Sequence, residues 1–139
     1  MFKRILAPVD LAHLETIQRA LKITAEEAHH HNVPVTYISV AASAPGEIAH
    51  NPDEFRAKLK AFAQEQAEAW NIDTTAMAVI THDPAIDIDD ALLQAVKDTG
   101  ADLVIMASHK PGFADYFWPS NGGKVASHTN ASVFVVRDN

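Results

Sequence analysis

Residues 103–107 read Leu-Val-Ile-Met-Ala, the most continuously apolar run of the chain. A second apolar run, Ile-Leu-Ala-Pro-Val at residues 5–9, is bracketed by charged residues. Short runs without polar alternation are typical of strands that are buried on both faces of a parallel sheet. The two runs therefore predict two central strands that lie next to each other.

Extended and helical patterns alternate on both sides of these runs. The other expected strands cover residues 33–40, 72–80 and 132–136, and threonines in the 72–80 segment favour an edge position. The expected helices cover residues 12–32, a stretch that begins at Asn51-Pro52, residues 83–99 closed by Gly100, and a segment from Ser120 or Asn121 to about Asn130. This order predicts one α/β doubly wound domain over residues 1–139, with a five-stranded parallel sheet and four helices.

Composition excludes several classes of protein. The 139 residues are 47% apolar and 21% charged, which is typical of a globular domain and not of a disordered chain. The net charge of −7 argues against non-specific nucleic-acid binding, which needs a basic surface. The absence of cysteine excludes disulfides, thiolate metal sites and cysteine nucleophiles.

Targeting signals are also missing from the sequence. No apolar run approaches the roughly 20 residues that span a bilayer, and the first apolar run stops at Asp10, too early for a signal peptide. We therefore expect a cytoplasmic protein that has no contact with membranes.

The two central strands also predict where a ligand would bind. In doubly wound sheets, ligands bind beyond the carboxyl ends of the strands, at the point where the strand order reverses. The segments that follow the two strands are Pro8–Ala12 and Ser108–Pro119, and the second is long for a connection in this fold class.

The second segment leads into Ser120-Asn121-Gly122-Gly123-Lys124, a helix start rich in small residues. Free N–H groups and the positive end of the helix dipole suit such a position to an anion. An alternative interpretation is that Ser120 only caps the helix and the glycines only ease packing. Lys110 and Lys124 would add positive charge if an anion binds there.

Motifs for other activities are absent. Gly123-Lys124 is followed by Val125 rather than Ser or Thr, which excludes a Walker A loop, and no dinucleotide-binding Gly pattern occurs. His29-His30-His31 cannot share one metal ion, because neighbouring helical residues point about 100° apart. Without a nucleophile–base pair or paired carboxylates, the sequence predicts no catalytic residues and no metal site.

Several segments together resemble the universal stress protein family over essentially the whole chain. They are Ile5–Asp10, Val79–Pro84, Ala101–His109, Ser120-Asn121 and Ser132–Arg137. The sequences Ser108-His109-Lys110-Pro111 and Ser120-Asn121 resemble a subgroup that carries Ser-His-Arg-Pro and Gly-Ser-Asn.

The resemblance implies a Rossmann-like sheet of order 3-2-1-4-5 and a site for ATP or AMP that can include Mg²⁺. It implies that Asp10 contacts the ribose or adenine, that the main chain near Val40 recognises the base, and that the segment after Met106 holds the phosphates. The candidate nucleotide-binding residues are Pro8, Val9, Asp10, Val40, Met106, Ala107, His109, Lys110, Ser120, Asn121 and Gly122.

The sequence departs from the pattern of the nucleotide-binding members. These members carry Gly-x-x-Gly, nine residues, and then Gly-Ser or Gly-Thr, whereas this chain has Ala107, Lys110 and Pro119 at the glycine positions and a shorter spacer. Pro119 removes a backbone donor that a phosphate would use. A family member without nucleotide, acting only through protein contacts, is therefore the alternative hypothesis.

The resemblance further implies a homodimer formed through the last strand, with an interface at Ser132, Val133, Phe134, Val135 and Val136. Pairing would cover an edge that is otherwise prone to aggregation. The expected function is a stress-response sensor or adaptor that binds an adenine nucleotide, orders residues 108–119 around it and then contacts a protein partner. Slow ATP hydrolysis remains a third hypothesis, if Asp10 helps to position a magnesium ion.

Overall fold

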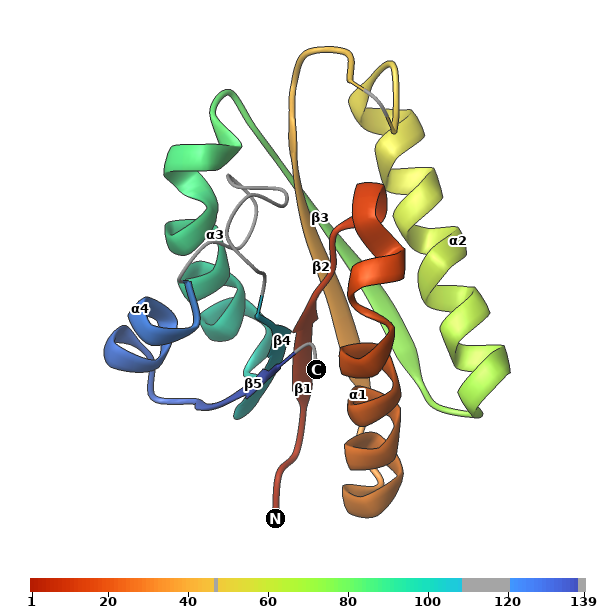
Figure 1. The fold of residues 1–139 in the computed structure, drawn as a ribbon, viewed down its shortest axis with the longest axis vertical. Coiled ribbons are helices and arrows are strands. Elements are labelled where there is room, and N and C mark those ends of the chain that lie inside the picture. Colours follow the sequence, from red (N-terminus) through yellow and green to blue (C-terminus); the bar gives the residue numbers. More distant parts are fainter. Residues whose placement is uncertain (47, 109–120, 138–139) are drawn as a thin grey trace.

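The computed structural model describes residues 1–46, 48–108 and 121–137, and its centre is a five-stranded parallel sheet in the order β3-β2-β1-β4-β5 (Figure 1). The strands are β1 (Ile5–Pro8), β2 (Val35–Ala42), β3 (Thr74–Thr81), β4 (Leu103–Ala107) and β5 (Ser132–Val136). The helices are the 3-10 helix η1 (Leu11–Thr16) and the α-helices α1 (Gln18–His31), α2 (Pro52–Trp70), α3 (Pro84–Thr99) and α4 (Asn121–His128). The predicted fold class and strand order are confirmed.

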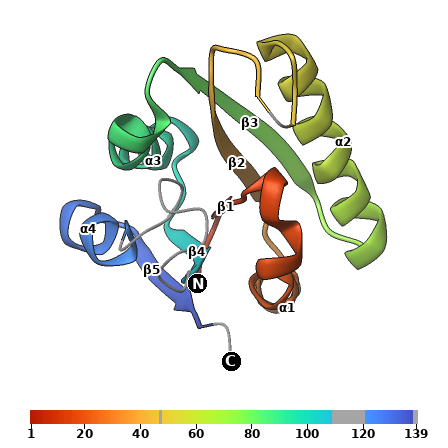
Figure 2. The same cartoon turned by 45° about the horizontal axis from the view of Figure 1, so that its top comes forward.

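The helices form two layers around the sheet. Helices α1 and α2 cover one face, and α3 and α4 cover the other (Figures 1 and 2). Successive residues of β1 point to opposite layers, so Ile5 belongs to the core beneath α1 and α2, and Leu6 to the core beneath α3 and α4. Leu59 of α2 and Leu92 of α3 are fully buried in these two cores. No helix in the described part of the chain is long and apolar enough to cross a membrane.

The first expected helix is divided in two. Residues 11–16 form the tighter 3-10 helix, Ile17 has non-helical dihedral angles, and the α-helix starts at Gln18. Apolar residues spaced three and four apart fit both helix types, so the sequence pattern cannot locate such a break. The last predicted helix is also shorter than expected, because α4 ends at His128 rather than near Asn130.

Two strands begin later than predicted, because the preceding residues close helices. Asn32 and Asn71 adopt the left-handed conformation, both with φ near 54°. In the turn that each forms, Val33 N–H donates to Ala28 O at 3.1 Å and Ile72 N–H donates to Ala67 O at 3.2 Å. These bonds satisfy free carbonyls at the helix ends. Val33 and Ile72 therefore belong to helix caps and not to the strands that follow.

Other predicted caps are confirmed. Asn51 accepts a 2.8 Å hydrogen bond from Glu54 N–H at the start of α2, and Gly100 ends α3 with φ of 70°. The return bond of the predicted capping box goes to a different residue, because the Glu54 carboxylate accepts from His50 N–H at 3.3 Å.

The sheet separates between β1 and β4 at its carboxyl end. The β1–β4 pairing covers only Ile5–Leu103 and Leu6–Val104, whereas β1 follows β2 as far as Pro8–Ile38. Val9 N–H donates to Ile38 O at 2.8 Å, so by alternation the nitrogen of Pro8 faces β4. Proline has no N–H to donate there, and this missing donor accounts for the end of the ladder.

Asp102 joins the amino ends of β1 and β4. Its carboxylate accepts hydrogen bonds of 3.0 to 3.1 Å from Lys3 N–H and Arg4 N–H. Desolvation acts to raise the pKa of Asp102, but these N–H groups and the charge of Lys3 outweigh it and hold the pKa below its ordinary value.

We expect Asp102→Asn to flatten the acid limb of the stability profile. A lowered folded-state pKa contributes stability above the unfolded-state value of about 3.9, and this contribution is lost as the pH falls through the folded-state pKa. Urea unfolding from about pH 6 to about pH 2.5 should show a wild-type advantage of about 1 kcal/mol or less near neutrality that shrinks in acid. The exposed Asp90→Asn serves as the control, and an unchanged acid slope in Asp102→Asn would contradict this assignment.

Candidate functional site

A cavity of about 630 Å³ lies beyond the carboxyl ends of β1, β2 and β3. Its walls come from the segment 10–13 after β1, the end of β2 with the loop that follows it, the start of α2, and Asp83-Pro84 after β3. These loops meet at one end of the sheet because parallel strands all end there. The volume is within the range of about 300 to 1,000 Å³ that is usual for small-molecule sites.

Asp10 is a buried carboxylate on the wall of this cavity. It is 1% exposed, and its Oδ1 atom accepts a 3.0 Å hydrogen bond from Ala12 N–H, which caps the 3-10 helix. Its Oδ2 atom lies 2.9 Å from Nδ1 of His13, whose side chain is 33% exposed. A carboxylate offers about four lone-pair positions, so Asp10 retains the capacity to accept a hydrogen bond from a ligand.

The hydroxyl of Ser39 is a second polar group at the cavity. Ser39 lies on β2, is fully buried and lines the cavity, and among the described residues its Oγ atom has no hydrogen-bond partner. Leaving a buried hydroxyl unpaired costs about 1 to 3 kcal/mol. A ligand that hydrogen-bonds to Ser39 would remove that cost.

Tyr37 lies two residues before Ser39 on the same strand. Its hydroxyl is also unpaired within the described residues, and burial raises the pKa of its phenol. Its ring packs edge-on against Phe62 of α2, with the ring centroids 5.3 Å apart. Tyr37 is therefore a core residue and is not among the residues that line the cavity.

Hydrogen bonds between the loops hold the other side of the cavity. Ser43 N–H donates to Thr81 O at 2.9 Å, and Ser43 Oγ lies 3.3 Å from Nδ1 of His82. The Thr81 hydroxyl also bonds the carboxylate of Asp87 on α3. These contacts connect the loops after β2 and β3, which contribute Ala44 and Asp83 to the cavity wall.

The structure brings together only part of the predicted site. Asp10 and Val40 line the cavity, while Pro8 and Val9 lead the chain to it. Met106 and Ala107 end β4 across the gap from β1 and do not line this cavity, and Asn121 and Gly122 lie in the first turn of α4. His109, Lys110 and Ser120, like Pro119, are outside the residues that the structure describes.

Sequence reasoning missed several cavity residues. They include Ser39, His13, Phe55 and the loop residues Ala44, Pro45 and Gly46. The position of Ser39 carried a usable signal, because a polar residue interrupts the apolar strand Tyr-Ile-Ser-Val at residues 37–40. Phe55 gave no such signal, because an apolar residue on a helix predicts only that it faces the core.

The histidine run at residues 29–31 contacts its own helix and the end of α2. His29 Nε2 lies 2.5 Å from Trp70 O, and His31 Nε2 lies 3.2 Å from a carboxylate oxygen of Glu27. Within residues 1–46, 48–108 and 121–137, no three His, Asp or Glu side chains are arranged to hold a metal ion.

Comparisons with known proteins agree with one another. The model of the universal stress protein family matches residues 1–137. Universal stress protein G of Shigella flexneri is 27% identical to the chain over 146 residues, which cover 99% of the chain and 100% of that relative.

Two solved structures share the fold at low sequence identity. A universal stress protein of Archaeoglobus fulgidus in complex with dAMP has a TM-score of 0.66 and 17% identity, with 96% of each chain covered. A family member from Arabidopsis thaliana with AMP bound has a TM-score of 0.65 and 15% identity, with 99% of this chain and 92% of that chain covered.

Proposed function

The chain belongs to the universal stress protein family, and from this premise we propose that it binds an adenine nucleotide, ATP or AMP, in the cavity at Asp10 and Ser39. It would act as a ligand-dependent sensor or adaptor in the cytoplasm rather than as a turnover enzyme. The observation that carries the proposal is the pairing of a buried carboxylate with an unpaired buried hydroxyl on the wall of one cavity.

The chemistry of the wall suits a nucleoside. A ribose hydroxyl can donate to the free lone pairs of Asp10, and Ser39 Oγ can donate to or accept from the ligand. The apolar side chains of Val40, Ile48 and Phe55 suit the flat face of a base. The dAMP and AMP complexes of the structural neighbours support the choice of adenine.

Released ligand and thermal stability together test the proposal. Freshly purified protein is denatured and the released small molecules are separated by chromatography, while a second sample is melted with AMP, Mg-ATP or GMP. A nucleotide at about 100 times its Kd adds about 2.7 kcal/mol, which is a shift of several degrees for a domain of this size. We expect AMP or ATP to raise the Tm and GMP to leave it nearly unchanged.

Two results would contradict the proposed function. If no nucleotide is released and no melt moves, the nucleotide proposal is wrong and the alternative holds, in which Lys110 and Pro119 leave the family fold without a phosphate site. Phosphate release from Mg-ATP above the buffer rate would contradict the assignment of a non-enzymatic role.

We also propose that the protein is a homodimer paired through β5. Ser132 N–H donates to Asp102 O and Val136 O accepts from Ser108 N–H, so by alternation the peptide groups of Val133 and Val135 face away from β4. Phe134 is 41% exposed beside this edge. A second copy paired along the edge would satisfy these peptide groups and cover the phenylalanine.

A further inference from the structure

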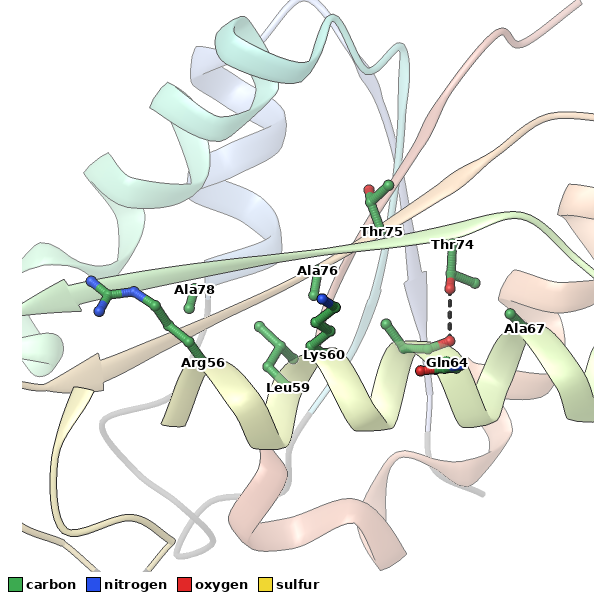
Figure 3. A pocket seen from close by; sticks show the side chains of 10 residues that line it. Arg56, Leu59, Lys60, Gln64, Ala67, Thr74, Thr75, Ala76 and Ala78 are labelled. Carbon is green, nitrogen blue, oxygen red and sulfur yellow. Dashed lines mark hydrogen bonds between the residues drawn. The ribbon is translucent and has the colours of Figure 1, made fainter. Parts of the chain in front are cut away.

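The opposite edge of the sheet carries a second cavity, of about 540 Å³, between β3 and α2 (Figure 3). We refer to it as the β3 groove. It is lined from the helix by Arg56, Leu59, Lys60 and Gln64, and from the strand by residues that include Ala76 and Ala78. Figure 3 shows the stems of Arg56 and Lys60 projecting from the helix toward the strand. Strand β2 separates β3 from β1, and no described residue lines both this groove and the cavity at Asp10, although Phe55 and Arg56 of α2 line one each.

The main chain of β3 presents free hydrogen-bonding groups to this groove. Asp73 O accepts from Val35 N–H, and Thr81 O accepts from Ser43 N–H, both at 2.9 Å. The odd-numbered peptide groups of β3 therefore face β2, and the even-numbered groups from Thr74 to Ile80 face outward. No strand of the described residues lies on that side.

The side chains of the same even-numbered residues leave room for a partner. Thr74 Oγ1 donates to Ala63 O of α2 at 2.7 Å, so the even-numbered side chains face the helix. At positions 76 and 78 they are alanines, whose methyl groups leave the space beneath Arg56 and Lys60 unfilled. An added strand could place alternate side chains on these methyl groups and on the stems of the two cations.

The β3 strand itself lacks the sequence features that usually block such pairing. Natural edge strands commonly carry a proline, an inward charge or a bulge, or are very short. Residues 74–81 read Thr-Thr-Ala-Met-Ala-Val-Ile-Thr, eight residues without a proline or a charge, and all of them pair with β2 in unbroken register. An unblocked edge of this length suits recognition by strand addition.

Charge indicates the kind of partner. The groove residues contributed by the described chain are neutral or cationic, in a protein whose net charge is −7. Among the described residues, Arg56 forms one ion pair, with Asp53 at 3.2 Å, but Asp53 is 97% exposed and such a pair contributes little. We propose that the β3 groove binds an acidic, extended segment of a partner protein as a sixth strand of the sheet.

A second copy of this chain fits the groove less well. A two-fold pair through β3 would bring the same patch against itself and set Arg56 and Lys60 near the same cations of the other copy. An acidic segment instead meets both cations with opposite charge, which favours a partner chain over self-association.

The direct test is an NMR titration of the full chain with a synthetic peptide, acetyl-Val-Glu-Val-Glu-Val-Glu-Val-amide. We expect a Kd of about 0.1 to 1 mM, as suits a short unanchored strand. The amides of Ala76, Ala78 and Ile80 should shift and exchange more slowly with solvent. Those of Thr75 and Met77, which already face β2, should change much less.

Two control peptides separate strand addition from charge attraction. The same peptide with lysine in place of glutamate should bind at least about fivefold more weakly. A glutamate peptide that is N-methylated at alternate residues keeps its charge but has no N–H donors along one edge. This peptide should bind only through its other, unmodified edge. A peptide N-methylated at every residue should not bind.

Matched variants locate the charge effect. Lys60→Glu should weaken binding of the glutamate peptide and strengthen binding of the lysine peptide, while Lys58→Glu makes the same charge change two residues away, outside the groove.

Three results would each overturn the proposal: equal effects of the two variants, binding of the fully N-methylated peptide, or chemical-shift changes centred on β5. Shifts of Ala76 and Ala78 that depend on protein concentration alone would also overturn it, in favour of a second copy. AMP binding measured on Lys60→Glu tests the nucleotide site separately, because Lys60 does not line the cavity at Asp10.

Discussion

Replacement of Asp10 by alanine is expected to raise the Kd for AMP by at least about tenfold. Hydrogen bonds to charged groups contribute about 1.5 to 3 kcal/mol, and 1.4 kcal/mol corresponds to a factor of ten in affinity. The variant also loses the cap of the 3-10 helix, because Ala12 N–H no longer has its acceptor. Its stability should therefore fall by about 1 kcal/mol.

Asp10→Asn separates the two losses. Asparagine caps a helix as well as aspartate does, so this variant should keep its stability while its affinity for AMP falls. Isothermal titration gives the affinity and urea unfolding gives the stability. Asp102→Asn, at the other end of the β1 segment, is the control that should leave AMP binding unchanged. If both Asp10 variants bind AMP with wild-type affinity, the nucleotide does not contact Asp10 and its site lies elsewhere.

Replacement of Val135 by proline is expected to convert the proposed dimer to a monomer. The N–H of Val135 faces away from β4, so proline removes a donor from the free edge and leaves the β4–β5 hydrogen bonds in place. Light scattering coupled to size-exclusion chromatography should show the molar mass falling to half, with a small change in the melting temperature.

The other edge strand supplies the matched control for this variant. Ala78→Pro removes an outward N–H from β3 in the same way, and it should leave the molar mass unchanged. A wild-type protein that is monomeric at all concentrations, or a Val135→Pro variant that stays dimeric, would contradict pairing through β5. If Ala78→Pro alone dissociates the dimer, the two copies meet at the β3 groove instead.

Some side-chain roles at the site were predictable from local chemistry. Asp10 follows a buried strand and precedes a helical pattern, so a capping role and a place at the sheet's carboxyl end both follow from its position. The edge position of β3 was likewise indicated by its threonines, and it is confirmed. Roles of this kind depend on neighbours in sequence, which the sequence shows directly.

The break between η1 and α1 was not predictable in this way. The chain leaves helical geometry twice there. One departure is at His13 (φ −135°, ψ 47°), whose ring contacts the Asp10 carboxylate, and the other is at Ile17 (φ −116°, ψ 12°) before α1. The apolar spacing of Leu14 and Ile17 suits an α-helix equally well, so no periodic pattern could reveal the tighter turn.

Apolar runs and helical periods were enough to predict the fold class, the adjacent central strands and the position of Asp10, because buried parallel strands need apolar runs and their connections need helices of matching period. The full strand order was implied by the family resemblance. The folded arrangement was needed to show that Ser39 lines the same cavity as Asp10, and that alanines on β3 leave a groove beneath Arg56 and Lys60. Both sites form between segments that are far apart in the chain. Their shape depends on the volumes that packed side chains leave unfilled, and local propensity does not encode those volumes.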